Sequence, residues 1–146
     1  MVLGHEALLA TLRAAVLDAG PAPRAQFLAC VRAHVKAHCD YAMLSVVINN
    51  ELHALSPEHA EPAVILRQAA ELLAFEIVQC GIREGAWHPP NLLATMKAIG
   101  SIGIRTANWF QPSAEQSAED LAAYYAELAL HILHMDGRIG SKSNPT

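Results

Sequence analysis

The spacing of the apolar residues constrains the fold of this chain more than any other feature. Apolar side chains recur every three or four positions, strict alternation is missing, and the helix formers Ala and Leu are frequent. Turn-forming clusters interrupt this pattern at residues 20–23, 88–91 and 111–112. The sequence therefore predicts an all-α fold of about six helices and no strand, over about residues 5–18, 24–38, 41–55, 61–82, 92–109 and 118–135.

Two helix starts carry explicit signals. Ser117 with Asp120 three residues later predicts a capping box at the start of the last helix. Ser56-Pro57-Glu58 has the pattern of an N-cap followed by a first turn. Pro62 complicates this second start, because proline inside a helix removes a hydrogen bond, and we expect the long helix to begin properly near Glu61.

The composition indicates a single, apolar domain that has no phosphate-binding surface. Of the 146 residues, 53% are hydrophobic and 16% charged, so we expect a partner subunit or an apolar pocket to cover part of the surface. The ten Lys and Arg residues are scattered and the net charge is −4, which argues against nucleic-acid binding by this chain. We assign residues 1–137 to the domain and residues 138–146 to a flexible tail.

The cysteines and the N-terminus indicate a cytoplasmic protein. Cys30, Cys39 and Cys80 have no metal-site spacing and their odd number closes no disulfide set, so we expect free, buried thiols. No secretory signal is visible, and no apolar run approaches the roughly 20 residues that cross a bilayer.

The last two predicted helices carry a pattern typical of an interface. Apolar and small residues follow each other in these helices at alternating spacings of three and four, which is the pattern of a heptad seam. This seam predicts pairing with a second copy of the chain. The residues that we expect at this interface are Met96, Ile99, Gly103, Leu121, Tyr125, Leu128, Ile132 and Met135. The last helix has a second apolar face with Ala122, Ala126, Ala129 and Leu133. The alternative is that both faces form the internal core of a monomeric bundle.

Histidine pairs raise the question of a metal site. His34 and His38 are four residues apart, and His131 and His134 are three apart, so either pair could supply two ligands. No Glu-x-x-His spacing occurs, and His34 and His38 flank Lys36 on what we expect to be the wetter side of their helix. We interpret both pairs as solvated or hydrogen-bonded histidines. With no catalytic motif either, we expect no metal, no cofactor and no enzyme activity.

A polar stretch interrupts the otherwise apolar third helix. Asn49, Asn50 and Glu51 follow one another there, and a buried Glu51 would need a partner, for which Arg67 is the nearest candidate in sequence. These residues form a structural salt bridge, an exposed polar edge, or a polar anchor in an apolar ligand pocket.

Several segments resemble one known family in their order and spacing. These are Leu55-Ser56-Pro57-Glu58-His59, Arg67, Gly81-Ile82-Arg83-Glu84-Gly85-Ala86-Trp87, Asn108-Trp109-Phe110-Gln111-Pro112 and Ala122-Ala123-Tyr124-Tyr125-Ala126. Together they resemble the C-terminal domain of TetR-family transcriptional regulators, and most closely the branch of steroid- and lipid-catabolism repressors. Gly4-His5-Glu6-Ala7-Leu8-Leu9 is similar to the start of that family's fourth helix, just past its DNA-binding domain.

This resemblance implies a sensing and dimerising domain. The last two helices would pair with those of a second subunit, and an apolar cavity between the preceding helices would bind a small hydrophobic effector, with acyl-CoA thioesters or lipid-derived acids as the leading class. The residues that we expect to line it are Met43, Val47, Asn50, Glu51, Leu66, Arg67, Phe75 and Trp109. The family's helix-turn-helix is absent from these residues, so DNA binding would need a domain that this chain lacks. A ligand-free helical dimerisation protein is the main alternative, and a small metal-dependent helical enzyme is a third.

Overall fold

The computed structural model describes residues 1–135 and contains only helices and loops within that range. The helices are α1 (Val2–Asp18), α2 (Pro23–Asp40), α3 (Ala42–Leu52), α4 (Pro57–Arg83), α5 (Leu92–Thr106) and α6 (Ala118–Leu133). The predicted all-α class and the six helices are thus confirmed. The predicted tail of residues 138–146 lies outside the described part of the chain.

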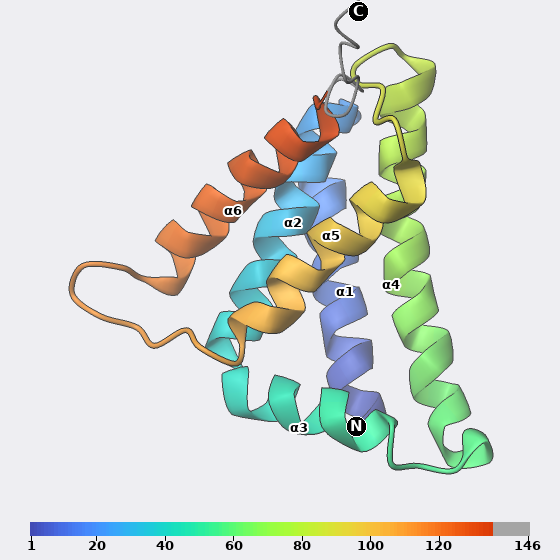
Figure 1. Cartoon of the computed structure of the whole chain (residues 1–146), viewed down its shortest axis with the longest axis vertical. Coiled ribbons are helices and arrows are strands. Elements are labelled where there is room, and N and C mark those ends of the chain that lie inside the picture. The colour runs from blue at the N-terminus through green and yellow to red at the C-terminus, as the bar shows by residue number, and fades with distance from the viewer. Residues whose placement is uncertain (136–146) are drawn as a thin grey trace, which may run out of the picture.

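Helix α2 is the centre of the bundle. It packs against α6 and α1 most extensively, and also against α5, α4 and α3. Figure 1 shows α1, α2 and α4 running lengthwise, α5 crossing them obliquely, and α3 lying across the end where the chain begins. No helix within residues 1–135 is long and apolar enough to cross a membrane.

The core is built around α2 and the indole of Trp87. Phe27 and Val35 of α2 are almost completely buried, and Phe27 lies 5.7 Å from the Trp87 ring, centroid to centroid. The Trp87 Nε1–H donates a hydrogen bond of 2.9 Å to the Val78 carbonyl. The missing side chain of Gly81 makes room for this ring, because a Cβ there would lie 2.1 Å from Trp87.

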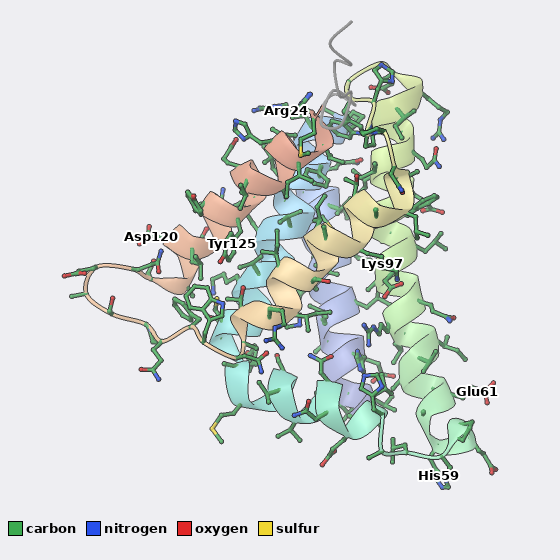
Figure 2. All side chains as sticks on the ribbon, in the orientation of Figure 1. Arg24, His59, Glu61, Lys97, Asp120 and Tyr125 are labelled. Atoms are coloured by element: carbon green, nitrogen blue, oxygen red, sulfur yellow. The ribbon has the colours of Figure 1, made fainter. Side chains whose placement is uncertain are left out.

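The start of α4 differs from the prediction. The helix begins at Pro57 and continues through Pro62, so the expected start near Glu61 was wrong. Residues 57–59, 61 and 62 at the start of α4 are exposed, and Figure 2 shows His59 and Glu61 at the outer end of this helix. Pro62 has no N–H, so one carbonyl of the preceding turn of α4 has no hydrogen-bond partner within the helix. Water can replace this lost hydrogen bond because the carbonyl lies in this exposed part of the helix. Ser56 occupies the N-cap, but its hydroxyl bonds to His59 Nδ1 at 2.7 Å and caps no backbone N–H.

The capping box of α6 is confirmed. The Ser117 Oγ accepts a hydrogen bond from the Asp120 N–H at 3.1 Å, and an Asp120 carboxylate oxygen accepts one from the Ser117 N–H at 3.2 Å. Helix α5 ends at Thr106, three residues before the expected end. In the loop that follows, Phe110 is buried whereas Trp109 is 53% exposed.

The predicted interface residues divide between the interior and the surface. Ile99, Gly103 and Leu121 are buried within the single chain, as are the Ala122, Ala126, Ala129 and Leu133 of the second face. Met96, Tyr125 and Ile132 are half-buried against this core. Leu128 and Tyr124 are exposed on the outer face of α6, and Met135 is exposed two residues beyond the end of the helix. The internal-core alternative therefore holds for one face of α6, and an apolar stripe remains on the other.

Candidate functional site

A cavity of about 420 Å³ lies between α1, α2, α4 and α5, with Asn49 of α3 at its edge. This volume falls in the range of small-molecule sites. Most of the lining is apolar, contributed by Leu8, Leu12, Cys30, Val31, Leu66, Ala70, Leu72, Ala74, Phe75, Leu93, Met96, Ile99 and Ile104. The cavity can therefore hold an apolar molecule out of water.

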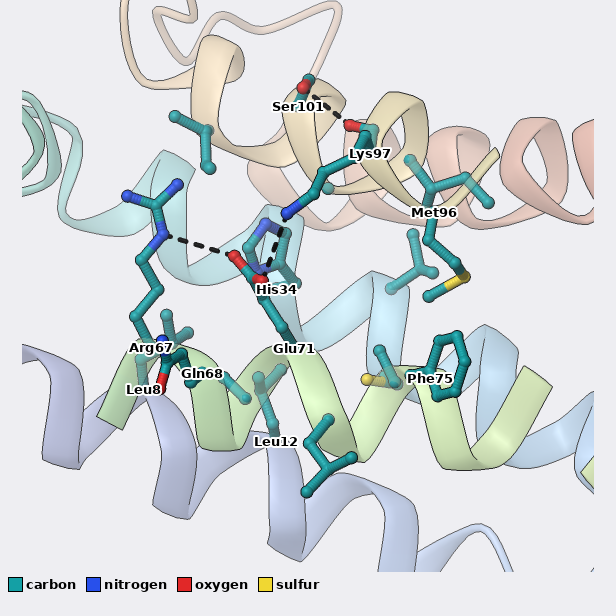
Figure 3. A pocket seen from close by; sticks show the side chains of 18 of the residues that line it. Leu8, Leu12, His34, Arg67, Gln68, Glu71, Phe75, Met96, Lys97 and Ser101 are labelled. Atoms are coloured by element: carbon teal, nitrogen blue, oxygen red, sulfur yellow. Dashed lines mark hydrogen bonds and ion pairs between the residues drawn. The ribbon is translucent and has the colours of Figure 1, made fainter. Parts of the chain in front are cut away.

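An ion-pair cluster joins α4 to α5 at one part of the cavity wall. Arg67 Nε lies 3.4 Å from Glu71 Oε1, and Lys97 Nζ lies 3.3 Å from Glu71 Oε2. Figure 3 shows these three side chains beside the His34 ring, with Phe75 and Met96 farther along their helices. All three ion-pair partners are at least one-third exposed, so water screens the pairs and they add little to the stability of the fold. Their main consequence is a polar end on an otherwise apolar cavity.

Three histidines also line the cavity. His5 comes from α1, and His34 and His38 come from α2, with 4.4 Å between the centroids of the latter two rings. The expectation that His34 and His38 occupy a wet face was wrong: His38 is buried, and His34 packs against α5, where a Cβ on Gly103 would lie 2.1 Å from the His34 ring. Lys36, which lies between them in sequence, points outward and pairs with Asp40.

Burial keeps these histidines neutral. It lowers the pKa of His34 to about 3, and the charges of nearby His38 and Arg67 act in the same direction. Burial also lowers the pKa of His38, and burial followed by the charge of Arg67 lowers that of His5. The neutral form of an imidazole has one donor and one acceptor nitrogen, so each ring can bind a polar group without adding charge.

Two of these rings have an unused hydrogen-bonding nitrogen. Within residues 1–135, Nε2 of His5 and Nε2 of His34 are buried without a hydrogen-bond partner. The Gly100 backbone acts to raise the His34 pKa, opposite to burial, but the His34 Nε2 forms no hydrogen bond within the described residues. Leaving such a group unpaired costs about 1–3 kcal/mol. Unlike these two, His38 donates its Nδ1–H to the His34 carbonyl at 2.8 Å.

The predicted cavity residues are only partly brought together. Leu66, Arg67 and Phe75 line the cavity, and Asn49 lines it in place of Asn50. Arg67 pairs with Glu71 instead of Glu51. The other five predicted residues lie outside the cavity lining and are all exposed, Met43 at 85%: they are Met43, Val47, Asn50, Glu51 and Trp109.

Sequence reasoning missed most of the polar lining. The Arg67–Glu71 pair has the i,i+4 spacing of helix-surface ion pairs, which could have revealed it. No local signal marks Lys97 or His5, because each reaches the cavity only through the packing of separate helices. Cys30 lines the cavity as a buried thiol whose pKa burial raises to about 11, so it remains protonated and unreactive at neutral pH. Cys39 is also buried and free, whereas the free Cys80 is only half-buried.

Comparisons with known proteins agree with this architecture. A family model described as "Tetracyclin repressor-like, C-terminal domain" matches residues 20–133. A regulatory protein of the TetR family from Rhodococcus RHA1 has a similar solved structure, with a TM-score of 0.82 and 32% identity over 91% of this chain and 70% of that one. The TetR-family transcriptional regulator PfmR from Thermus thermophilus is similar with a TM-score of 0.74 and 24% identity, over 92% of this chain and 75% of that one.

A third solved structure, titled superantigen pfit, shares the fold with a TM-score of 0.66 and 21% identity, over 89% of this chain and 68% of its own. Among curated proteins no match was found. The family model covers most of the chain, and the Rhodococcus protein exceeds 30% identity over nearly all of it. This chain therefore belongs to the TetR repressor-like C-terminal domain family, the regulatory part of TetR-type transcriptional regulators.

Proposed function

We propose that this chain is the effector-binding and dimerising part of a TetR-type transcriptional repressor, located in the cytoplasm. The effector is a small hydrophobic molecule, with acyl-CoA thioesters and lipid-derived acids as the two leading classes. The cavity between α1, α2, α4 and α5 is the observation that carries this proposal, because its volume and apolar lining suit such a ligand. Operator binding belongs to a helix-turn-helix domain outside these 146 residues.

Effector binding would act by stabilising one arrangement of the helices around the cavity. Side chains of four helices line it, among them Leu12 of α1, Phe75 of α4 and Met96 of α5. A ligand that fits better in one arrangement shifts the population toward it, by as much as its affinities for the two states differ.

Thermal unfolding with a panel of acyl-CoAs, fatty acids and polycyclic acids tests the proposal. A ligand at about one hundred times its Kd stabilises the folded state by about 2.7 kcal/mol, which raises the midpoint of a domain of this size by roughly 5–10 °C. Gly100→Leu is the control, because Gly100 lines the cavity and its Cβ direction meets open space, so the new side chain fills the cavity. No shift with any ligand, or an equal shift in Gly100→Leu, would contradict the proposal and favour a ligand-free dimerisation protein.

Dimerisation through α6 is the second part of the proposal. Tyr124 and Leu128 are exposed four residues apart on the outer face of this helix, and exposed Met135 follows two residues after the helix ends. Half-buried Tyr125 and Ile132 flank the stripe. A continuous apolar stripe on a helix is typical of four-helix contacts between two subunits.

Charge substitutions in this stripe test the dimer. Leu128→Glu should give a monomer by light scattering, whereas Met43→Glu, at another exposed apolar position, should leave a dimer. Tyr124→Arg provides a second variant at a more exposed site, which removes the risk that Leu128→Glu merely unfolds α6. Folded dimers of both α6 variants would refute this interface.

A further inference from the structure

The charged groups of the cavity gather toward one end. Arg67, Glu71 and Lys97 meet there beside the His34 ring, while Phe75 and Met96 lie farther along α4 and α5 (Figure 3). Arg67 and Phe75 are eight residues apart on α4, which corresponds to about 12 Å along the helix axis. The cavity is therefore polarised along its length, and an amphipathic molecule matches this shape better than a uniformly apolar one.

The charge at the polar end matches one negative charge. Arg67, Lys97 and Glu71 are the charged residues that line the cavity, and two cations with one carboxylate leave a net charge of +1. The three lining histidines add nothing to this charge because burial holds them neutral. A single carboxylate would balance this excess positive charge. The several phosphate charges of a coenzyme A group would be neutralised by only one unit of positive charge in the cavity, and the whole chain has a net charge of −4.

Unpaired hydrogen-bonding groups also line the cavity. Nε2 of His5 and Nε2 of His34 have no partner within residues 1–135, and the His34 ring lies beside the ion-pair cluster (Figure 3). An imidazole N–H can donate to a carboxylate oxygen, and a ligand that pairs a buried polar group removes the cost of leaving it unpaired. A wholly apolar ligand would leave both nitrogens unpaired.

We propose that the effector of this cavity is a free monocarboxylic acid with an apolar body, whose carboxylate lies at the polar end beside Arg67, Lys97, His5 and His34. The apolar body extends along α4 and α5 toward Phe75 and Met96. This inference rests on the proposed effector-binding function and narrows it to one chemical class.

Isothermal titration with a matched ligand series tests the inference. Decanoate, decanol and decanoyl-CoA share one alkyl chain and differ in the head group: a single carboxylate, an uncharged hydroxyl, and a bulky polyanion. The protein should bind decanoate about ten- to a hundredfold more tightly than decanol, since a hydrogen bond to a charged group contributes that much. Decanoyl-CoA should also bind at least tenfold more weakly than decanoate.

Two arginine variants on the same helix locate the carboxylate. Arg67→Gln should weaken decanoate binding at least tenfold and leave decanol binding unchanged. Arg83→Gln is the matched control, because Arg83 is exposed on α4 outside the cavity, and it should leave both ligands unchanged. Circular dichroism confirms that each variant is folded.

The outcomes separate this inference from the proposed function. Decanol binding as tightly as decanoate, decanoyl-CoA binding more tightly, or Arg67→Gln leaving decanoate binding unchanged would each overturn the carboxylate assignment while leaving a ligand-binding cavity in place. Absence of binding by all three ligands would also overturn the assignment. The proposed function would then fall only if the whole panel of effectors failed in thermal unfolding as well.

Discussion

Two glycines of α5 provide a matched test of how closely α2 and α5 pack. A Cβ on Gly103 would lie 2.1 Å from His34 Cδ2 and 2.4 Å from Nε2, whereas a Cβ on Gly100 would meet nothing within 4 Å. Both positions are inside the same helix, three residues apart. Alanine at either position gains helix propensity of up to about 1 kcal/mol. Only alanine at Gly103 also has to displace a buried ring.

The difference in the free energy of unfolding between the two variants measures the cost of packing an extra methyl group against His34. Forcing an extra methyl group into a packed interior costs about 1–3 kcal/mol. We therefore expect Gly100→Ala to be about 1 kcal/mol more stable than the unmodified protein, and Gly103→Ala to be about 1–3 kcal/mol less stable than Gly100→Ala. The shared gain in helix propensity cancels in this comparison.

Urea unfolding followed by circular dichroism measures both variants at one fixed protein concentration, because the proposed dimerisation would make stability depend on concentration. In a His34→Ala background the ring is absent, and the penalty at Gly103 should disappear. Equal stability of the two glycine variants in the unmodified background would refute the placement of His34 against α5.

Three further predictions concern proton uptake, capping and the core. The pKa of His34 falls from 6.5 to about 3 on folding because of burial, so its contribution to stability is complete above pH 6.5 and is lost as the pH falls toward 3. Urea titrations should show a loss of roughly 2 kcal/mol between about pH 6.5 and 4.5 that His34→Gln lacks, and parallel profiles would contradict this assignment. Ser117→Ala removes the cap of α6 and should lower the free energy of unfolding by about 1 kcal/mol, whereas Ser113→Ala in the preceding loop should have a smaller effect. Trp87→Phe loses the hydrogen bond to Val78 and part of the core packing, and should cost about 2 kcal/mol in the same assay; a loss below about 0.5 kcal/mol would show that the indole contributes little.

Local signals were sufficient for most of the fold. The periodic apolar residues and the Ser117–Asp120 box predicted α6 because capping involves neighbouring residues only. The start of α4 was predicted too late because the cost of Pro62 depends on whether water reaches the carbonyl that it leaves unpaired. That exposure is a property of the folded surface, which the spacing of residues does not reveal.

The site was harder to predict because its polar groups come from separate helices. Lys36 suggested a wet face for α2, but His34 turns toward α5, where Gly103 leaves room for its ring. Arg67 lines the cavity, and its i,i+4 spacing to Glu71 is visible in the sequence, but the Lys97–Glu71 pair depends on which side of α4 faces α5. A glycine opposite a histidine on another helix is a tertiary signal, and one sequence alone does not contain it.

Histidine side-chain ¹⁵N spectra test the central claim most directly. If the cavity binds a carboxylic acid at its polar end, saturating decanoate should shift the ring-nitrogen resonances of His5 and His34, while those of the exposed His53 and His59 stay unchanged. Unchanged His5 and His34 resonances at saturation, or shifts confined to the exposed histidines, would show that the acid binds elsewhere and would contradict the account.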